Sequence, residues 1–357
     1  MSKKDVNLCT VFDSNYLDKG IVLYQSLKAV CDNFILFVFA FDEKAKEILE
    51  LLSYDNMVVI GLKDFETEEL REVKNKRSRG EYCWTCTPIV IQHVLDKYNV
   101  ADCTYIDSDL FFYQSPEVLL KEFYASNCSV GLVKHRFPKT KRGRYNEKSS
   151  GTYCVQFNTF KNDENARKLL EIWKQQCLFE CSIKKGGDQY YITDWGRLYD
   201  QVYEYQNIGA GVAPWNLMNY KLKKSKFKVD LTYLNENHEL VFYHFQGIQY
   251  SQEGQVNINV ITASGGGFIK KKYINYLYYP YLKEIEIVRD MLMQDYQIQY
   301  FNDGCNRNFK SVKFNLFRFL HSFVRRIFKE SLYSAIEFLF RVIRKKYDII
   351  EIRDVRK

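Results

Sequence analysis

The feature that most constrains the fold is the run of residues 34–41, which is almost continuously apolar. A strand has this composition when both of its faces are buried, as in a parallel sheet covered by helices. A β-rich run at residues 7–12 and a helical pattern precede it, and a helix at 43–52 and a short strand at 57–60 follow. We therefore expect an α/β fold that opens β-α-β-α-β and binds its ligands beyond the carboxyl ends of the strands.

Length and composition allow a large buried core. The chain has 357 residues, of which 46% are hydrophobic, which suits one large domain with an appendage or two domains. Ten cysteines and no signal peptide at the first residues indicate a reducing cytoplasm. There is no Gly-X-Gly-X-X-Gly and no Gly-Lys-Ser phosphate loop, so an ordinary dinucleotide or ATP site is unsupported.

Two acids one residue apart, Asp107 and Asp109, stand between a strand-like run and a second apolar run. Side chains at positions i and i+2 share a face of an extended chain, so both carboxylates can leave the strand end together. Such hard oxygen donors suit a divalent cation, which can neutralise a pyrophosphate. The alternative is two solvated acids that open a turn. The apolar flanks favour a metal site, because carboxylates near a core need a partner.

Three further polar groups have two readings each. His244 ends a strand-like run and is either a metal ligand, as a neutral imidazole, or a structural histidine. Asp188 follows two glycines and is either a reacting group or a helix N-cap. Arg77 and Arg79 precede a helix start and either hold a phosphate or are solvated.

The basic and polar residues 139–150 are expected to form a mobile loop over the site.

Six short motifs follow one another along residues 13–247. In order they are Asp-X-Asn-Tyr, Arg-Ser-X-X-Glu-Tyr-X-Trp-Thr, Tyr-Ile-Asp-Ser-Asp-Leu-Phe-Phe, Gly-Asp-Gln, Ala-Pro-Trp-Asn and Tyr-His-Phe-X-Gly. This order resembles bacterial nucleotide-diphospho-sugar transferases of the GT-A fold, which are distantly similar to glycosyltransferase family 8. The resemblance covers residues 5 to about 250. It implies a Rossmann-like mixed sheet flanked by helices, to which this chain adds a C-terminal amphipathic helical appendage.

The resemblance also implies site residues. Asp107, Asp109 and His244 would hold the metal, and a carboxylate and imidazole set favours Mn²⁺ or Mg²⁺. Asp188 and Gln189 would lie at the sugar-transfer centre. The donor nucleotide sugar would be bound by Asp13, Asn15 and Tyr16 at the base and ribose, by Arg77, Trp84 and Thr85 near the diphosphate or sugar, and by Asp107 and Ser108.

One departure from the family is clear. Family 8 enzymes usually follow the metal histidine with Gly-X-X-Lys-Pro-Trp, whose lysine touches the diphosphate, whereas residues 245–250 contain no lysine. Another cation, such as Arg77, Arg79 or Lys134, is then needed. This leaves the stereochemistry open, because Asp188 could serve as a nucleophile or front-face partner in a retaining enzyme or as a base in an inverting one.

Most of the net charge of +8 lies near the C-terminus. Residues 313–346 hold nine Lys or Arg against two Glu, a local charge of +7. Apolar residues recur there at three- and four-residue spacing, which predicts a cationic amphipathic helix suited to an anionic membrane surface. The alternative is a helical pair that packs on the catalytic domain or on a partner. We expect a catalytic domain at 1–272, a helical extension at 273–312 and a basic tail at 313–357.

These features predict a metal-dependent hexosyltransferase, peripheral on the cytoplasmic face of the cell membrane. It would use a nucleotide-diphosphate sugar, a UDP-sugar in the first instance, and an acceptor in lipopolysaccharide, capsule or a lipid-linked glycan. One alternative is a glycosyltransferase that modifies protein. The other is a nucleic-acid-binding protein that uses the basic tail, but the tail carries long Phe and Leu side chains, so no nucleic acid partner is expected.

Overall fold

The computed structural model describes residues 6–225, 228–250, 254–264, 269–298 and 348–356. The chain divides into two compact units, Met1–His244 and Phe245–Lys357. The predicted membrane-binding segment, residues 313–346, lies outside the described residues. The predicted domain boundaries after residues 272 and 312 therefore stay predictions.

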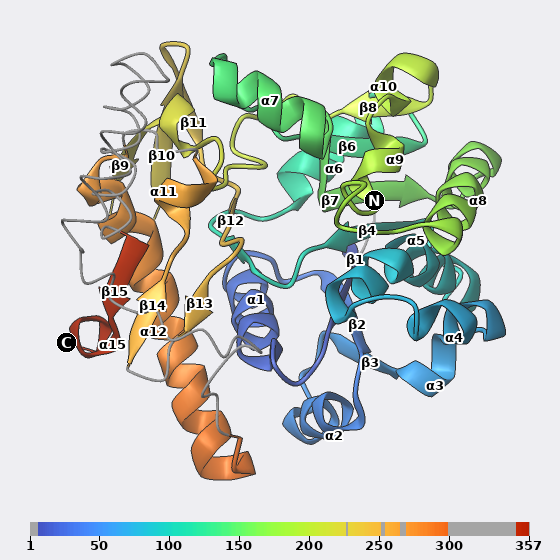
Figure 1. Cartoon of the computed structure of the whole chain (residues 1–357), viewed down its shortest axis with the longest axis horizontal. Coiled ribbons are helices and arrows are strands. Elements are labelled where there is room, and N and C mark those ends of the chain that lie inside the picture. The colour runs from blue at the N-terminus through green and yellow to red at the C-terminus, as the bar shows by residue number, and fades with distance from the viewer. Residues whose placement is uncertain (1–5, 226–227, 251–253, 265–268, 299–347, 357) are drawn as a thin grey trace, which may run out of the picture. The chain divides into compact units, whose positions relative to one another are not determined.

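A seven-stranded mixed sheet forms the centre of the first unit (Figure 1). In spatial order its strands are β3 (Met57–Gly61), β2 (Phe34–Ala40), β1 (Val6–Phe12), β4 (Asp102–Ile106), β7 (Tyr153–Lys161), β6 (Val130–Lys134) and β8 (Val202–Glu204). The first four run parallel to one another, and β7 runs antiparallel to both β4 and β6. This confirms the predicted α/β class with a mixed sheet and the β-α-β-α-β opening.

Helices flank this sheet. They are α1 (Leu17–Val30), α2 (Glu43–Leu52), α3 (Leu62–Phe65), α4 (Glu68–Lys74), α5 (Arg79–Lys97), α6 (Glu117–Ala125), α7 (Lys141–Ser150), α8 (Glu164–Phe179), α9 (Gln189–Ile192) and α10 (Trp195–Leu198). The expectation of a loop at residues 139–150 is wrong, because α7 forms there. Its start is capped by the Thr140 side chain, which accepts a hydrogen bond from the Gly143 amide.

Two smaller sheets complete the first unit. The strands β9 (Lys221–Lys224), β10 (Val229–Tyr233) and β11 (Glu236–Glu239) form an antiparallel meander, and a 3₁₀ turn at Leu217–Asn219 precedes it. The strand β5 (Leu110–Phe112) pairs with β12 (Phe242–His244). The pairing of β5 with β12 brings the last residues of the first unit next to the turn that follows β4.

The second unit is smaller. Its described part contains a sheet of β13 (Gln249–Tyr250), β14 (Gln255–Asn257) and β15 (Ile349–Glu351), and the helices α11 (Val260–Ala263), α12 (Lys271–Tyr296) and α15 (Ile352–Val355). Within it the rings of Phe245 and Tyr281 stack at 3.7 Å between centroids. Among the described residues no helix is both long and apolar enough to cross a membrane.

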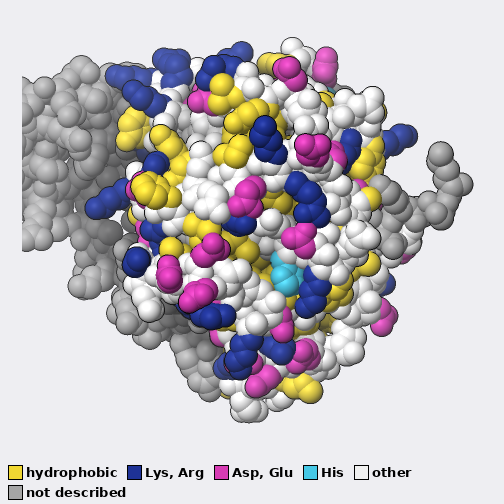
Figure 2. Space-filling model, turned by 90° about the vertical axis from the view of Figure 1, so that its right-hand side faces the viewer, with side chains coloured by type: hydrophobic (Ala, Val, Ile, Leu, Met, Phe, Trp, Pro, Cys, Tyr) yellow, Lys and Arg dark blue, Asp and Glu magenta, His cyan; other side chains and the backbone are white. Residues whose placement is uncertain are grey.

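One face of the described surface mixes the two signs of charge. Figure 2 shows acidic and basic side chains interspersed over most of one face, with hydrophobic side chains between them. Such a mixture is typical of a solvated surface.

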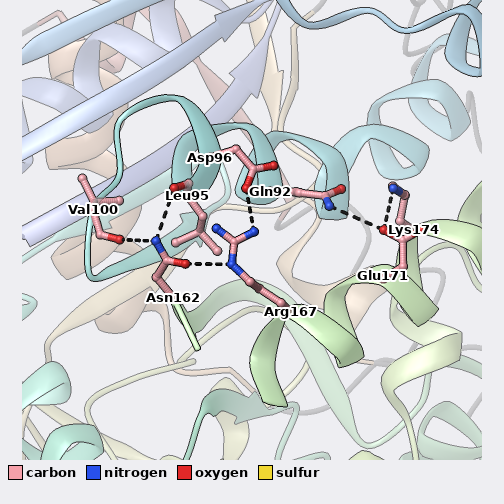
Figure 3. A network of polar contacts seen from close by, with 8 residues as sticks. All are labelled: Gln92, Leu95, Asp96, Val100, Asn162, Arg167, Glu171 and Lys174. Carbon is pink, nitrogen blue, oxygen red and sulfur yellow. Dashed lines mark hydrogen bonds and ion pairs between the residues drawn. The ribbon is translucent and has the colours of Figure 1, made fainter. Parts of the chain in front are cut away.

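A polar network ties α5 to the segment that leads into α8 (Figure 3). The side-chain amide of Asn162 donates to the carbonyls of Leu95 and Val100, at 3.3 and 2.9 Å, where α5 ends. Its carbonyl oxygen accepts from Arg167, which also pairs with Asp96. The network satisfies carbonyls that the end of a helix leaves without a partner, and it fixes α8 against α5.

We expect Asn162→Ala to lower the free energy of unfolding by about 1–3 kcal/mol, because it removes these hydrogen bonds from partly buried carbonyls. Urea denaturation would measure the change. The matched control is Lys63→Ala, which breaks an ion pair with Glu43 whose side chains are 86% and 59% exposed, and it should cost less than about 1 kcal/mol. Equal losses in the two variants would show that the network does not hold α5 and α8 together.

Candidate metal centre

The structure brings the three predicted metal ligands together. Asp107 and Asp109 occupy the turn between β4 and β5, and His244 ends β12 directly opposite Leu110 in the antiparallel pair. Ligand atoms of Asp107, Asp109 and His244 lie within 4.8 Å of one another. The imidazole Nε2 is 2.9 Å from an oxygen of Asp109 and 3.6 Å from one of Asp107. Strand pairing alone therefore assembles a cluster from positions more than 130 residues apart.

The imidazole of His244 is fixed from behind. Its Nδ1 lies 2.9 Å from Oε1 of Gln156, a fully buried side chain on β7. With Nδ1 donating to that carbonyl oxygen, Nε2 is the nitrogen that faces the two acids. The ring of Trp215 packs edge-on against the imidazole at 5.3 Å, and the Trp215 indole donates to the carbonyl of His135 at 3.0 Å. The Ala-Pro-Trp-Asn motif thus supports the histidine.

The electrostatics of the cluster suit a divalent cation. Burial raises the pKa of Asp107 to about 7. Burial would also raise the pKa of Asp109, but the facing His244 imidazole holds it below its usual value. Burial would lower the pKa of His244, but the two carboxylates raise it above its usual value. Mn²⁺ or Mg²⁺ fits this set of hard oxygens and imidazole, and a bound cation would compete with protons for these three groups.

Lys19 is a buried cation near this cluster that the sequence reasoning missed. Its side chain is 2% exposed, and its charge is among those that lower the pKa of Asp109. It lies on α1 two turns before Ser26, whose hydroxyl accepts from the amide of Phe112 on β5. Residues seven apart share a face of a helix. Lys19 and Ser26 therefore lie on the face of α1 that contacts β5, and Asp109 directly precedes β5.

The predicted base-binding residues lie at the same edge of the sheet. Asp13 follows β1, which is parallel to and paired with β4. The amides of Asn15 and Tyr16 donate to the Asp13 side chain and carbonyl, each at 2.9 Å. The guanidinium of Arg79 forms an ion pair with Asp13. These four residues therefore form one bonded turn beside the Asp107 strand end.

Other residues that were predicted to bind the nucleotide sugar already contact groups of the protein itself. Arg77 donates to the carbonyls of Cys177 and Leu178 at the end of α8, at 3.4 and 3.2 Å. The hydroxyl of Thr85 donates to the Glu81 carbonyl one turn back on α5. The ammonium of Lys134 lies 2.5 Å from the Glu204 carboxylate. Of the three cations expected to replace the missing lysine, only Arg79 is held at the Asp13 turn.

Asp188 lies at a strained turn in the same unit. Gly186 and Gly187 have φ values of +102° and +73°, a region that favours glycine. An added Cβ on Gly187 would lie 3.1 Å from the ring of Trp84, so Trp84 packs directly against the turn. The indole of Trp173 on α8 donates to the Asp188 carbonyl at 3.0 Å. A glycine at position 187 therefore allows the backbone to pass Trp84.

The carboxyl group of Asp188 is buried and only partly compensated. It accepts a hydrogen bond from the Gln189 amide, as its N-cap reading predicts. Its other oxygen, Oδ2, has no hydrogen-bond partner of good geometry among the described residues, although the nearby Thr87 hydroxyl acts to lower the pKa of the group. Burial raises its pKa to about 7, and its charge is among those that raise the pKa of Asp107. The cap and the reacting-group readings are thus compatible, since each uses a different oxygen. Ser108 lies between the two metal-binding acids and is partly buried.

We expect Asp188→Asn to stabilise the protein at pH 8. The native state raises the pKa of Asp188 from 3.8 to about 7, so the charged form is destabilised in the folded chain by up to about 4 kcal/mol. This penalty is absent below pH 4, grows as the pH rises to 7 and is constant above. Urea titrations at several pH values should show the stabilisation at pH 8 and its loss toward pH 4. An effect independent of pH would contradict the assignment.

We expect Gln156→Met to weaken Mn²⁺ binding by about 10- to 100-fold, because it removes the acceptor that orients His244. Calorimetry or the electron spin resonance of Mn²⁺ would measure the affinity. Thr104→Val is the matched control, since Thr104 is a fully buried polar side chain of the adjoining strand that bonds to Thr159 instead. If both variants bind Mn²⁺ as the wild type does, Gln156 has no role at the metal.

Comparisons with solved structures find sugar transferases. Mouse xyloside xylosyltransferase 1, in its apo form, is 12% identical with a TM-score of 0.44, over 68% of this chain and 98% of that one. The galactosyltransferase LgtC, in complex with donor and acceptor sugar analogs, is 13% identical with a TM-score of 0.45, over 68% of this chain and 87% of that one. Likeness at this level does not establish a shared activity.

Comparisons with curated sequences give stronger matches. No family model matches the chain. The uncharacterized protein YfnF of Bacillus subtilis (strain 168) is 29% identical over 275 residues, which are 74% of this chain and 89% of YfnF. The uncharacterized protein YfnD of the same strain is 30% identical over 256 residues, 70% of this chain and 80% of YfnD. The extent of this second match shows that the chain belongs to the same protein family as YfnD.

Proposed function

We propose that this protein is a metal-dependent glycosyltransferase that moves a hexose from a nucleotide-diphosphate sugar, in the first instance a UDP-sugar, to a hydroxyl of a glycan acceptor. The observation that carries the proposal is the cluster of Asp107, Asp109 and His244 at the carboxyl edge of the sheet. The proposal is supported by Asp188, a buried carboxyl group with a raised pKa whose charge also raises the pKa of Asp107. Cation ligands beside a tuned carboxyl group are typical of an active site.

Asp107, Asp109 and His244 would hold Mn²⁺ or Mg²⁺. The bound cation would neutralise the charge that develops on the leaving diphosphate. Gln156 keeps Nε2 of His244 turned toward the acids, so the ligand set is organised before the cation arrives. This organisation reduces the rearrangement needed on binding.

The turn of Asp13, Asn15 and Tyr16 would border the base and ribose. The Tyr16 side chain is 37% exposed, and the Lys19 ammonium lies over its ring at 4.0 Å from the centroid, so a base would stack on the remaining ring surface. Arg79, paired with Asp13, would approach a phosphate of the donor. Trp84 would contribute by fixing the turn that carries Asp188.

Asp188 and Gln189 would act at the sugar. A carboxyl group with a pKa of about 7 exists in both forms at neutral pH, so it can accept a proton from an acceptor hydroxyl, as an inverting enzyme requires. The same group could instead stabilise or attack the anomeric carbon in a retaining enzyme. Analysis of the product anomer separates the two. The acceptor class inferred from the sequence, lipopolysaccharide, capsule or a lipid-linked glycan, and the membrane-binding tail remain proposals.

We expect UDP or another nucleoside diphosphate to raise the thermal midpoint of the wild-type protein when Mn²⁺ is present and not when a chelator replaces it. Asp109→Asn should abolish both this stabilisation and metal-dependent hydrolysis or transfer of the donor, since it removes a metal ligand. Asp55→Asn, which makes the same change at an exposed position, should behave as the wild type does. Donor turnover that survives in Asp109→Asn would remove the proposed metal site.

A further inference from the structure

The helix α7 presents an unusual surface. Among its residues only Gly143 is buried, so no side chain of the helix is fully covered. Five exposed cations lie on the helix and just before it, Lys139, Lys141, Arg142, Arg144 and Lys148, against the single acid Glu147. None of the five forms an ion pair with any residue that the structure describes, whereas many other cations of the first unit do. The positive charge of α7 is therefore available to a partner.

This helix is held firmly at both ends although its side chains are exposed. An added Cβ on Gly143 would lie 1.8 Å from the Pro138 carbonyl oxygen, so the first turn packs directly on the preceding backbone. At the other end Gly151 has a φ of +85°, and an added Cβ would meet the Thr193 hydroxyl at 2.3 Å. The Gly151 carbonyl also lies 3.0 Å from Nδ1 of His135. The C-terminal end of the helix is thus packed against the α9 segment.

The C-terminal end of α7 adjoins the sugar-transfer turn. An added Cβ on Gly186 would lie 3.3 Å from the Ser149 carbonyl oxygen and 3.6 Å from Cβ of Tyr190. Gly186 stands two residues before Asp188. The cationic surface consequently begins beside the residue that would receive the acceptor hydroxyl, and it extends away from that point (α7, top of Figure 1).

Exposed aromatic rings accompany the cations on both sides of this turn. Tyr145 on α7 is 62% exposed and lies 5.2 Å from the Arg142 guanidinium. Tyr190 on α9 is 49% exposed and lies 5.4 Å from the Lys185 ammonium. An exposed tyrosine ring offers an apolar face to the C–H side of a sugar and a hydroxyl to its polar edge. A cation beside it adds attraction for an acidic group.

We propose that the exposed face of α7, together with Tyr190, binds the acceptor as an anionic glycan, one that carries carboxylate or phosphate groups along its chain. This inference rests on the proposed function, since it names the acceptor class of the same site. The surface lacks the apolar stripe that a helix needs to lie in a membrane interface, because only a glycine of α7 is buried and the helix is otherwise polar except for Tyr145. A flexible polyanion needs only spaced cations and stacking faces.

The test compares two soluble probes of equal length, an oligogalacturonate with one carboxylate per sugar and a neutral malto-oligosaccharide. We expect the wild type to bind the oligogalacturonate at low salt and the neutral probe at least ten-fold more weakly. The triple variant Lys141→Gln, Arg142→Gln and Arg144→Gln should weaken oligogalacturonate binding by about ten-fold or more, because three attractive charges are lost. Tyr145→Ala and Tyr190→Ala, each made in the wild type, should weaken oligogalacturonate binding even at high salt, where the charges are screened and stacking on the rings remains.

The matched control removes three exposed cations elsewhere, Lys44→Gln, Lys121→Gln and Lys223→Gln, and it should leave binding unchanged. An equal loss in this control, or no binding by the wild type, would overturn the proposal. So would binding of phosphatidylglycerol vesicles or of single-stranded RNA through α7 that is tighter than binding of the oligogalacturonate. The Mn²⁺-dependent response to UDP is measured on the same variants. If the wild type lacks that response while oligogalacturonate binds through α7, the proposed function fails and the anionic glycan surface stands.

Discussion

The partial burial of Asp107 and Asp109 and the full burial of Asp188 are the constraint on which the rest of the site depends. A carboxylate that leaves water without a partner costs several kcal/mol, which must be offset by a proton, a cation or hydrogen bonds. Asp107 and Asp188 respond with pKa values raised to about 7, whereas Asp109 stays ionised against His244. A fold keeps such an arrangement against its own stability only where another requirement is met, and a bound cation is the simplest one.

Contacts between distant parts of the chain hold the groups of the site in place. The pairing of β5 with β12 delivers His244, and β7 delivers the Gln156 side chain that orients it. On the other side, α8 holds the Asp188 carbonyl through Trp173, and α5 supplies the ring of Trp84 against which the glycine turn packs. The polar network between α5 and α8 joins the two helices that contact the Asp188 turn.

The parts of this architecture that could be predicted are those written in local sequence. The uninterrupted apolar run at 34–41 identifies a strand covered on both faces, and the spacing of Asp107 and Asp109 places two carboxylates on one side of a strand end. His244 was open to two readings, and only the pairing with β5 decides where it lies. Gln156 and Lys19 were missed because local sequence does not show which buried group each side chain contacts. The partner of Gln156 lies 88 residues away along the chain, and Lys19, beside Asp18 and Tyr16, also acts on the distant Asp109. A polar residue at a position that should be buried is the signal that could have revealed both.

The arginines show why long cationic side chains resist prediction from sequence. Arg77 and Arg79 are two residues apart, yet one caps the end of α8 and the other pairs with Asp13, a choice that depends on which tertiary neighbour each long stem reaches. The same point bears on the lysine that family 8 enzymes carry after the metal histidine. Residues 245–250 have none, but Lys19 is buried in α1 close enough to Asp109 to lower its pKa. Positive charge therefore reaches this edge of the sheet from the first helix, where a cation inside the fold is screened less by solvent than one on a loop.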